Sequence, residues 1–114
     1  MNLRQFIKNE SLSRSWINEK YIHIYIRRSK RFINGEFHDC LDLASVTVDE
    51  NMRGKSIFSK FLFKFEKEAK KMNRVVYLEN VLEERLQNYL LNVRNYNSLN
   101  SHFGVTTFYK NERP

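Results

Sequence analysis

The sequence predicts one small α/β domain of the α+β kind, with a mixed, mainly antiparallel sheet and flanking helices. Two observations carry this prediction. The β-branched and aromatic run Tyr21–Ile26 and the turn signal Asn34-Gly35 after it predict a long hairpin, whose second strand runs to about Val48. An amphipathic helix then separates this hairpin from a further short strand. With 114 residues the chain can build one core but not two, so residues 1–114 are expected to form a single domain.

The turn of the hairpin fixes its register. Asn34 and Gly35 both tolerate the positive φ of a type I′ turn, and with these two at the turn the numbers of paired residues sum to 69. This register places two pairs of opposite charges across the strands: Lys30 with Asp39, and Arg27 with Asp42. A slip by one residue would lose both pairs. We expect Asp42 to be a surface partner of Arg27, and a β-bulge near Ala44–Val46 could break the register locally.

Helices and strands alternate after the hairpin. Seven apolar residues with helical spacing predict one buried helix face: Ile57, Phe58, Phe61, Leu62, Phe65, Ala69 and Met72. On the same helix, Glu66 and Lys70 are spaced to form an ion pair. The pattern then predicts a short buried strand at Arg74–Glu79, an amphipathic helix at about Glu83–Arg94 and a last strand at Val105–Tyr109.

Residues 1–20 have the least regular pattern. Two groups of apolar residues show helical spacing: Leu3, Phe6 and Ile7, and then Leu12 and Trp16. Three serines interrupt the second group. We therefore expect one or two short helices here, with Trp16 in the core.

Composition and charge narrow the class of protein. The net charge of +7 would attract an acidic partner such as nucleic acid, or it serves only solubility, and four lysines of the predicted helix form a basic stripe: Lys60, Lys64, Lys67 and Lys71. The single cysteine, Cys40, cannot form an internal disulfide, and no Cys/His group has zinc-ligand spacing, so no metal is expected. The sequence shows neither a secretory signal nor an apolar run of ~20 residues, so we expect a cytoplasmic protein without a membrane contact.

The polar loop between the hairpin and the first long helix is the most informative segment. Asp49–Ser56 contains Gly54, with Arg53 and Lys55 on either side, and the helix begins near Ile57. Backbone N–H groups converge at such a junction, and together with the helix dipole they favour a diphosphate. The loop is not a P-loop, because GxxxxGK[ST] is absent. An ordinary strand-to-helix loop is the alternative.

This loop lies within a longer motif, Val46-Thr-Val-Asp-Glu-Asn-Met-Arg-Gly-Lys-Ser-Ile-Phe, which is followed by Phe61-Leu62 and Glu66. The motif resembles the acetyl-CoA-binding segment of the GNAT superfamily of N-acyltransferases, in which Gln/Arg-x-x-Gly-x-Gly/Ala precedes two leucines and an acidic residue. Asn51 stands where the family has Gln or Arg, and Ser56 stands where it has Gly or Ala. Ser56 is small enough to preserve the loop.

The resemblance covers about residues 21–110. The run Val76-Tyr-Leu-Glu-Asn-Val, with Leu86 and Tyr89 after it, is similar to the strand and helix that come next in the family. Family members often place a tyrosine in this helix, where it protonates the departing CoA thiolate. The corresponding position here is Leu91, so Tyr89 would take that role only with a shifted alignment.

The resemblance implies direct transfer of an acetyl group from acetyl-CoA to an amine, which could belong to a macromolecule such as a protein. Main-chain groups of Ala44–Val48 would bind the pantetheine chain, and one N–H there would polarise the thioester carbonyl. The implied CoA site comprises Val46, Val48, Arg53, Gly54, Lys55, Ser56 and Ile57.

The reaction also needs a base that takes a proton from the incoming ammonium. Carboxylates suit this step, and the candidates are Glu79, Asp42 and, in third place, Glu50. Glu79 ends a predicted strand beside the expected cleft, or it caps the next helix, whereas Asp42 has a competing role as the partner of Arg27. With Tyr89 as the candidate acid, the expected catalytic residues are Glu79, Asp42 and Tyr89.

A second interpretation stays open. A protein with the same fold and no catalysis would use its basic surface to bind nucleic acid or an acidic protein.

Overall fold

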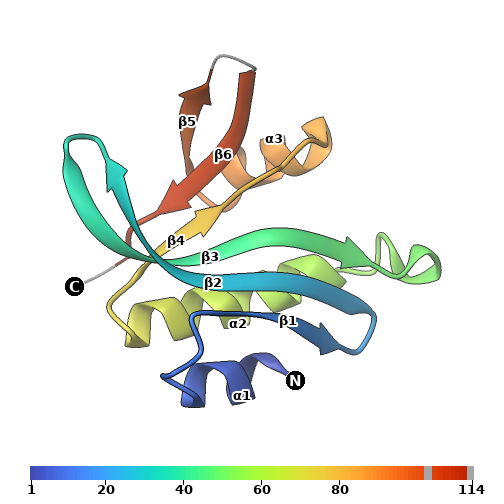
Figure 1. Cartoon of the computed structure of the whole chain (residues 1–114). Helices are drawn as coiled ribbons and strands as arrows, with labels where there is room; N and C mark the ends of the chain where they lie inside the picture. Colours follow the sequence, from blue (N-terminus) through green and yellow to red (C-terminus); the bar gives the residue numbers. More distant parts are fainter. Residues whose placement is uncertain (102–103, 113–114) are drawn as a thin grey trace.

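A mixed sheet with helices around it is present, as the sequence predicts (Figure 1). A computed structural model describes residues 1–101 and 104–112, without the side chains of 100–106. Its elements follow the order α1 (Leu3–Lys8), β1 (Arg14–Glu19), β2 (Ile22–Ile33), β3 (Glu36–Val48), a 3-10 turn (Glu50–Met52), α2 (Ile57–Lys71), β4 (Val75–Leu78), α3 (Glu84–Asn92), β5 (Asn97–Ser101) and β6 (Gly104–Lys110). In the described residues the strand order is β1-β2-β3-β4-β6-β5, and among these neighbours only β3 and β4 run parallel.

The β2–β3 hairpin has the predicted register along its outer part. Asn34 and Gly35 form the turn with φ values of 50° and 87°, and both predicted charge pairs lie directly opposite each other. Closer to the core the register shifts by one, because Tyr25 pairs with Ser45 whereas Ile26 pairs with Leu43. Ala44 is therefore an extra residue, and it forms a β-bulge at the place where the sequence allowed one.

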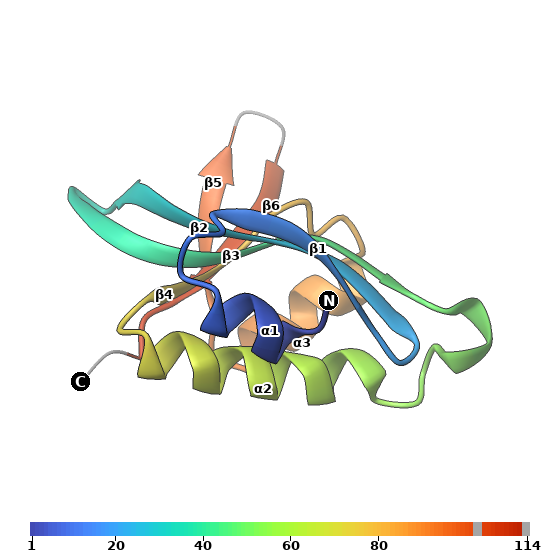
Figure 2. The ribbon, with the colours of Figure 1, turned by 60° about the horizontal axis from the view of Figure 1, so that its bottom comes forward.

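The helices α1 and α2 cover the same face of strands β1 to β3 (Figure 2). The predicted face of α2 is buried there, and its Leu62 and Phe65 belong to one apolar cluster with Ile24 and Ile26 of β2. A smaller cluster, formed by Ile33, Cys40 and Val75, lies on the opposite face of the sheet. Among the described residues, no helix is both long and apolar enough to span a membrane.

The prediction of a second helix near Leu12 and Trp16 is wrong, because this segment forms β1, an edge strand of the sheet. Strand pairing with β2 replaces the 3.6-residue period by a period of two, so Ile17 is fully buried while Trp16 faces the other side. The side chain of Trp16 is therefore 58% exposed rather than in the core, and its ring lies 5.1 Å from that of Tyr25.

The last third of the chain differs from the prediction in two ways. The helix α3 is shorter than expected, so Val93 lies outside it and is exposed. The Asn/Ser-rich segment after it forms β5, which pairs with β6 although it lacks the residues typical of strands. The predicted strand at 105–109 is confirmed as part of β6.

A buried carboxylate, Glu66, connects α2 to this last third. Its Oε1 accepts a hydrogen bond from Arg94, and its Oε2 accepts one of 2.8 Å from the hydroxyl of Tyr96. Lys110 Nζ lies 3.7 Å from the same Oε2. The predicted pair with Lys70 is wrong, because Glu66 points inward from α2 rather than along its exposed side. Burial, and then the charge of Glu66, raise the pKa of Tyr96 well above its ordinary value.

We predict that Glu66→Gln lowers the free energy of unfolding by about 3 kcal/mol, because it leaves the charges of Arg94 and Lys110 without their buried partner. Urea denaturation would measure the change. The matched control is Glu68→Gln on the same helix, which removes only an exposed i,i+3 pair with Lys71 and should cost less than about 0.5 kcal/mol. Equal effects of the two substitutions would contradict the prediction.

Candidate functional site

The parallel strands β3 and β4 begin side by side and then separate. Cys40–Leu43 pairs with Val75–Leu78, after which β4 ends while β3 continues for five more residues to Val48. Among the described residues, no strand takes the place of β4 beside this last part of β3. Beyond the bulge at Ala44, the edge of β3 on the β4 side therefore has no described strand beside it.

Two hydrogen bonds join β3 to the residues just after β4, at the point where the two strands separate. The backbone N–H of Glu79 donates to the carbonyl of Leu43 at 3.1 Å, and the side-chain amide of Asn80 donates to the carbonyl of Ala44 at 3.4 Å. Asn80 has a φ of 58°, a left-handed conformation that Asn adopts more easily than most residues, and there the chain leaves the sheet. The opening between the strands thus has a fixed inner end.

A cleft with a volume of about 1010 Å³ lies at the opening between β3 and β4. Its walls come from the end of β3 (Val46–Val48), from the loop and the start of α2 between Met52 and Ser59, and from α3 with Tyr89. A smaller hollow of about 230 Å³ continues it toward the inner end and is lined by Leu78 and Glu79. The two hollows adjoin, and we call them together the recess. They share three apolar side chains: Val46, Phe58 and Leu86.

The structure brings together six of the seven residues that the resemblance assigns to the CoA site. These six line the larger cleft: Val46, Val48, Arg53, Gly54, Ser56 and Ile57. Lys55 is exposed and does not line it. The sequence did not identify Phe58 and Leu86 as part of the cleft, since their apolar periodicity indicates only the core side of a helix.

The loop between β3 and α2 has an unusual backbone conformation. Gly54 and Ser56 have φ values of 80° and 62°, and Arg53 Nε donates a 3.3 Å hydrogen bond back to the carbonyl of Val48. The first backbone hydrogen bond within α2 runs from Lys60 to Ser56. In the described structure no side chain caps this end, and the first turn of α2 has no acidic residue. Its leading N–H groups are thus available to an anion.

The tyrosine expected in α3 lies two residues from its predicted place. Tyr89 lines the larger cleft and is partly buried against the core. Leu91, where the resemblance places the family's tyrosine, lines neither hollow and is partly exposed. The helical geometry of α3 therefore turns position 89, not 91, toward the larger cleft.

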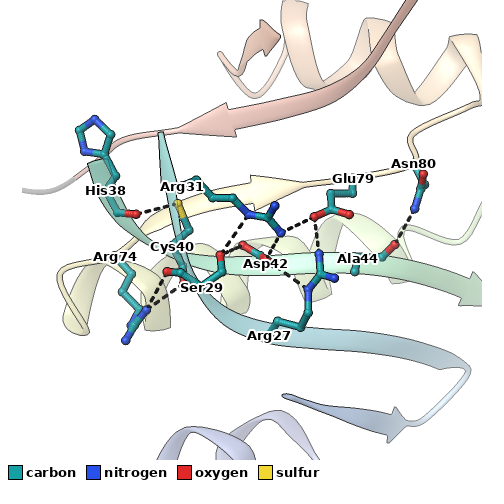
Figure 3. A network of polar contacts seen from close by, with 10 residues as sticks. All are labelled: Arg27, Ser29, Arg31, His38, Cys40, Asp42, Ala44, Arg74, Glu79 and Asn80. Carbon is teal, nitrogen blue, oxygen red and sulfur yellow. Dashed lines mark hydrogen bonds and ion pairs between the residues drawn. The ribbon is translucent and has the colours of Figure 1, made fainter. Parts of the chain in front are cut away.

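The candidate bases Asp42 and Glu79 lie in a network of charges on the sheet face opposite α2 (Figure 3). Asp42 is completely buried, so the prediction that it is a surface residue is wrong. It accepts hydrogen bonds of 2.7 Å from Ser29 Oγ and 2.8 Å from Arg31 Nη2, and Arg27 Nε lies 3.3 Å away. The reason for its burial is that β3 is a central strand and the side chains of β2 and β4 cover this position.

Glu79 shares both arginines with Asp42. Its Oε1 accepts a 2.6 Å hydrogen bond from Arg31 Nη2 and a second one from Arg27 Nη2. Among the described residues, none donates a hydrogen bond to its other oxygen, Oε2. Glu79 also lines the smaller hollow, whereas Asp42 lines neither hollow. Of the two acids, only Glu79 thus connects the charge network with the recess.

Aromatic and charged groups hold Arg31 in place. Its guanidinium lies over the ring of Tyr77, 4.6 Å from the centroid. Burial alone would lower the pKa of Arg31, but the hydrogen bond to Asp42 and the charges of Asp42 and Glu79 raise it above its ordinary value. Sequence analysis missed Arg31, although its signal was present: Arg27, Ser29 and Arg31 alternate along one face of β2 opposite Asp42.

The remaining candidates for chemistry are few. Burial, and then the charge of Asp42, raise the pKa of the Cys40 thiol to about 11, so this thiol is uncharged at neutral pH. In the part of the chain that the structure describes, no group of three or more His, Cys, Asp and Glu side chains is arranged to hold a metal ion.

The fold and the cleft together define a protein with a GNAT-like fold, as the resemblance implied. Solved structures that share it include a mutant of the toxin AtaT bound to the C-terminus of the antitoxin AtaR and acetyl-CoA (TM-score 0.64, 8% identity, 79% of this chain and 57% of that chain). Another is the KacTA–DNA complex (TM-score 0.61, 12% identity, 82% of this chain and 60% of that chain). At these identities the likeness establishes the fold alone, and the chain spans less than two thirds of either chain. No protein-family model matches the sequence, and no curated protein is similar to it.

We predict that alkaline pH destabilises the fold through Cys40. Its pKa in the folded state is about 11, against an ordinary value of 9.0, so its contribution to stability is complete below about pH 9 and is lost as the pH rises toward 11. The loss should reach about 2 kcal/mol. Urea denaturation at several pH values would show a steeper decline for the wild type than for Cys40→Ala, whereas parallel curves would contradict the prediction.

Proposed function

We propose that the protein is an N-acyltransferase that transfers an acetyl group from acetyl-CoA to an amine in the cytoplasm. The observation that carries the proposal is the opening between β3 and β4, which places a free strand edge and a helix start with available N–H groups around one cleft. The acetyl-CoA in the AtaT structure, which shares this fold, supports the assignment.

The cleft offers a matching surface to each part of acetyl-CoA. The diphosphate would bind at Gly54 and the first turn of α2, where Arg53 and the exposed Lys55 add positive charge. The pantetheine chain would lie along the open edge of β3 as an added strand, with Val46 and Phe58 beneath it. Its thioester would then reach the smaller hollow beside Glu79.

The transfer needs one bond to form and one to break. The amine nitrogen attacks the thioester carbonyl carbon, the new C–N bond forms and the C–S bond breaks. Glu79 Oε2, which has no hydrogen-bond donor among the described residues, would take the proton from the incoming ammonium. Tyr89 would donate a proton to the departing thiolate from its place in the cleft wall, and the second proton that the nitrogen loses would restore the Tyr89 hydroxyl.

Asp42 has a different role in this proposal. Because it is fully buried and lines neither hollow, it cannot meet the amine. It holds Arg27 and Arg31 by ion pairs, and these two hold the Oε1 atom of Glu79. Asp42 is thus a positioning residue for the proposed base. The amine could belong to a small molecule or to a macromolecule such as a protein.

We predict that saturating acetyl-CoA raises the melting temperature. At 100 times its Kd a ligand adds about 2.7 kcal/mol, which corresponds to about 11 °C for a domain of this size. Gly54→Val should abolish the shift, because a β-branched residue at a φ of 80° forces the loop to rearrange. Differential scanning fluorimetry with and without acetyl-CoA would measure both effects.

The matched control for this experiment is Gly35→Val. Gly35 also has a positive φ, 87°, and a Cβ atom would meet nothing within 4 Å at either glycine, so the two substitutions cause similar local strain. Gly35 lies in the hairpin turn, away from the cleft. Its variant should lose stability and keep the acetyl-CoA shift. No shift of the wild type at millimolar acetyl-CoA would refute the proposed function.

We predict that Glu79→Gln lowers kcat/KM for acetyl transfer by about 100-fold, because Gln keeps the shape of the side chain but cannot take a proton. Its thermal shift with acetyl-CoA should stay that of the wild type. The matched control is Glu83→Gln, since Glu83 lines the same recess without contacting the arginines. Release of CoA would be measured with an amine in excess. Full activity of Glu79→Gln would show that another group is the base.

One observation favours a second candidate, a non-catalytic protein that binds nucleic acid or an acidic protein. The exposed sides of α1 and α2 lie next to each other (Figure 2) and carry six basic residues: Arg4, Lys8, Lys60, Lys64, Lys67 and Lys71. The DNA in the KacTA complex, which shares the fold, is compatible with this candidate. It would be favoured if acetyl-CoA gave no thermal shift while DNA binding weakened steeply with salt.

A further inference from the structure

The two arginines of the charge network have hydrogen-bonding capacity that the protein does not use. Arg27 and Arg31 direct Nη2 to Glu79, and Arg31 also uses Nη2 for Asp42. Among the described residues, none accepts a hydrogen bond from Nη1 of either arginine. Their side chains are 28% and 31% exposed, so solvent or a ligand can reach the pair. Two guanidinium groups that are fixed on Asp42 and Glu79 and still have unused donors are suited to bind an anion.

This pair is held rigidly. The fully buried Asp42 binds both arginines, Ser29 Oγ accepts from Arg31 Nε at 3.3 Å, and the ring of Tyr77 supports the Arg31 guanidinium. A ligand would therefore find the donors already ordered and would lose little free energy in fixing them. If the network only stabilised the fold, it would require neither solvent-accessible guanidinium groups nor an Oε2 atom of Glu79 without a hydrogen-bond donor.

We propose that Arg27 and Arg31 bind a carboxylate or phosphate group of the acceptor, while its amine lies at Oε2 of Glu79. The proposal rests on the proposed function and names the class of substrate for the same site. The acceptor is then a zwitterion, with an anionic group a few bonds from the amine. Figure 3 shows both guanidiniums converging on Glu79, so the anion and the amine would bind side by side.

Charge balance explains why both groups of the acceptor are needed. Two arginines and two carboxylates make the network neutral. An anion alone would meet the negative charge of Glu79, and an amine alone would leave the guanidinium donors unused. A zwitterion satisfies both. Acetylation removes the positive charge of the amine. Once Glu79 has released the proton that it took, its negative charge repels the anionic product, which leaves.

The experiment compares pairs of amines that differ in the anionic group. The carboxylate pair is glycine and glycinamide, and the phosphate pair is O-phosphoethanolamine and ethanolamine. In at least one pair, we expect the member that carries the anionic group to have a kcat/KM at least tenfold higher. The pair that shows the difference identifies the anion. Because the amines also differ in their own pKa, the decisive quantity is how variants change this ratio, measured by CoA release.

Arg27→Lys and Arg31→Lys keep the positive charge beside Asp42 but remove the second donor. In each variant, the ratio of kcat/KM values within a pair should fall about tenfold, toward that of a protein that does not distinguish the two amines. The matched control is Arg14→Lys. Arg14 lies opposite Arg27 on β1 and is exposed, so this substitution should leave the individual kcat/KM values and their ratio unchanged. If the lysine variants keep the wild-type ratio, or if the wild type does not distinguish the members of either pair, the proposal is wrong even though acetyl transfer stands.

A binding measurement separates this proposal from the proposed function. In the absence of acetyl-CoA, millimolar glycine or O-phosphoethanolamine should raise the melting temperature of the wild type more than that of Arg31→Lys, and glycinamide or ethanolamine should not. This shift would support the anion site even if acetyl-CoA failed to bind. Its absence, with a normal acetyl-CoA shift, would overturn the site and leave the coenzyme cleft in place.

Discussion

The bulge at Ala44 reverses the alternation of side chains along β3. Before it, Leu41 and Leu43 face the helices, and after it Val46 and Val48 do so. If Ala44 were paired in regular alternation instead of forming the bulge, Ser45 and Thr47 would face the helices, and the wall that lies under the proposed pantetheine chain would be polar. The bulge also increases the local twist of β3 near the point where β4 ends, and the recess opens there. The apolar wall and the opening of the cleft thus both depend on one unpaired residue.

Two buried carboxylates hold together the parts that border the cleft. Glu66 fixes α2 to the segment after α3, so both walls of the cleft keep their spacing. Asp42 fixes β2 relative to the end of β4, because it binds two arginines of β2 that also bind Glu79. Each carboxylate has two cationic partners and a neutral hydroxyl donor, so neither leaves an uncompensated charge in the interior. The excess positive charge of the chain lies on the outside instead.

Local signals in the sequence were sufficient for about half of the fold and for most of the residues from β3 and the following loop that line the larger cleft. The hairpin register followed from Asn34-Gly35, and α2 followed from its apolar period. What the sequence missed depends on contacts between distant segments: β5 is a strand because β6 pairs with it, and Asp42 is buried because β4 lies beside β3. Arg31 belongs to the network for the same reason, since its carboxylate partner Glu79 is 48 positions away.

The turns of this chain use asparagine where many proteins use glycine. Four of the described non-glycine residues with positive φ are asparagines: Asn34, Asn73, Asn80 and Asn95. An asparagine side chain restricts the unfolded chain more than glycine does, so less conformational entropy is lost when each turn forms. Three of these turns follow α2, β4 and α3, the elements around the cleft. The recess is therefore stabilised partly through the unfolded state, by the limited freedom of its connections before any contact is made.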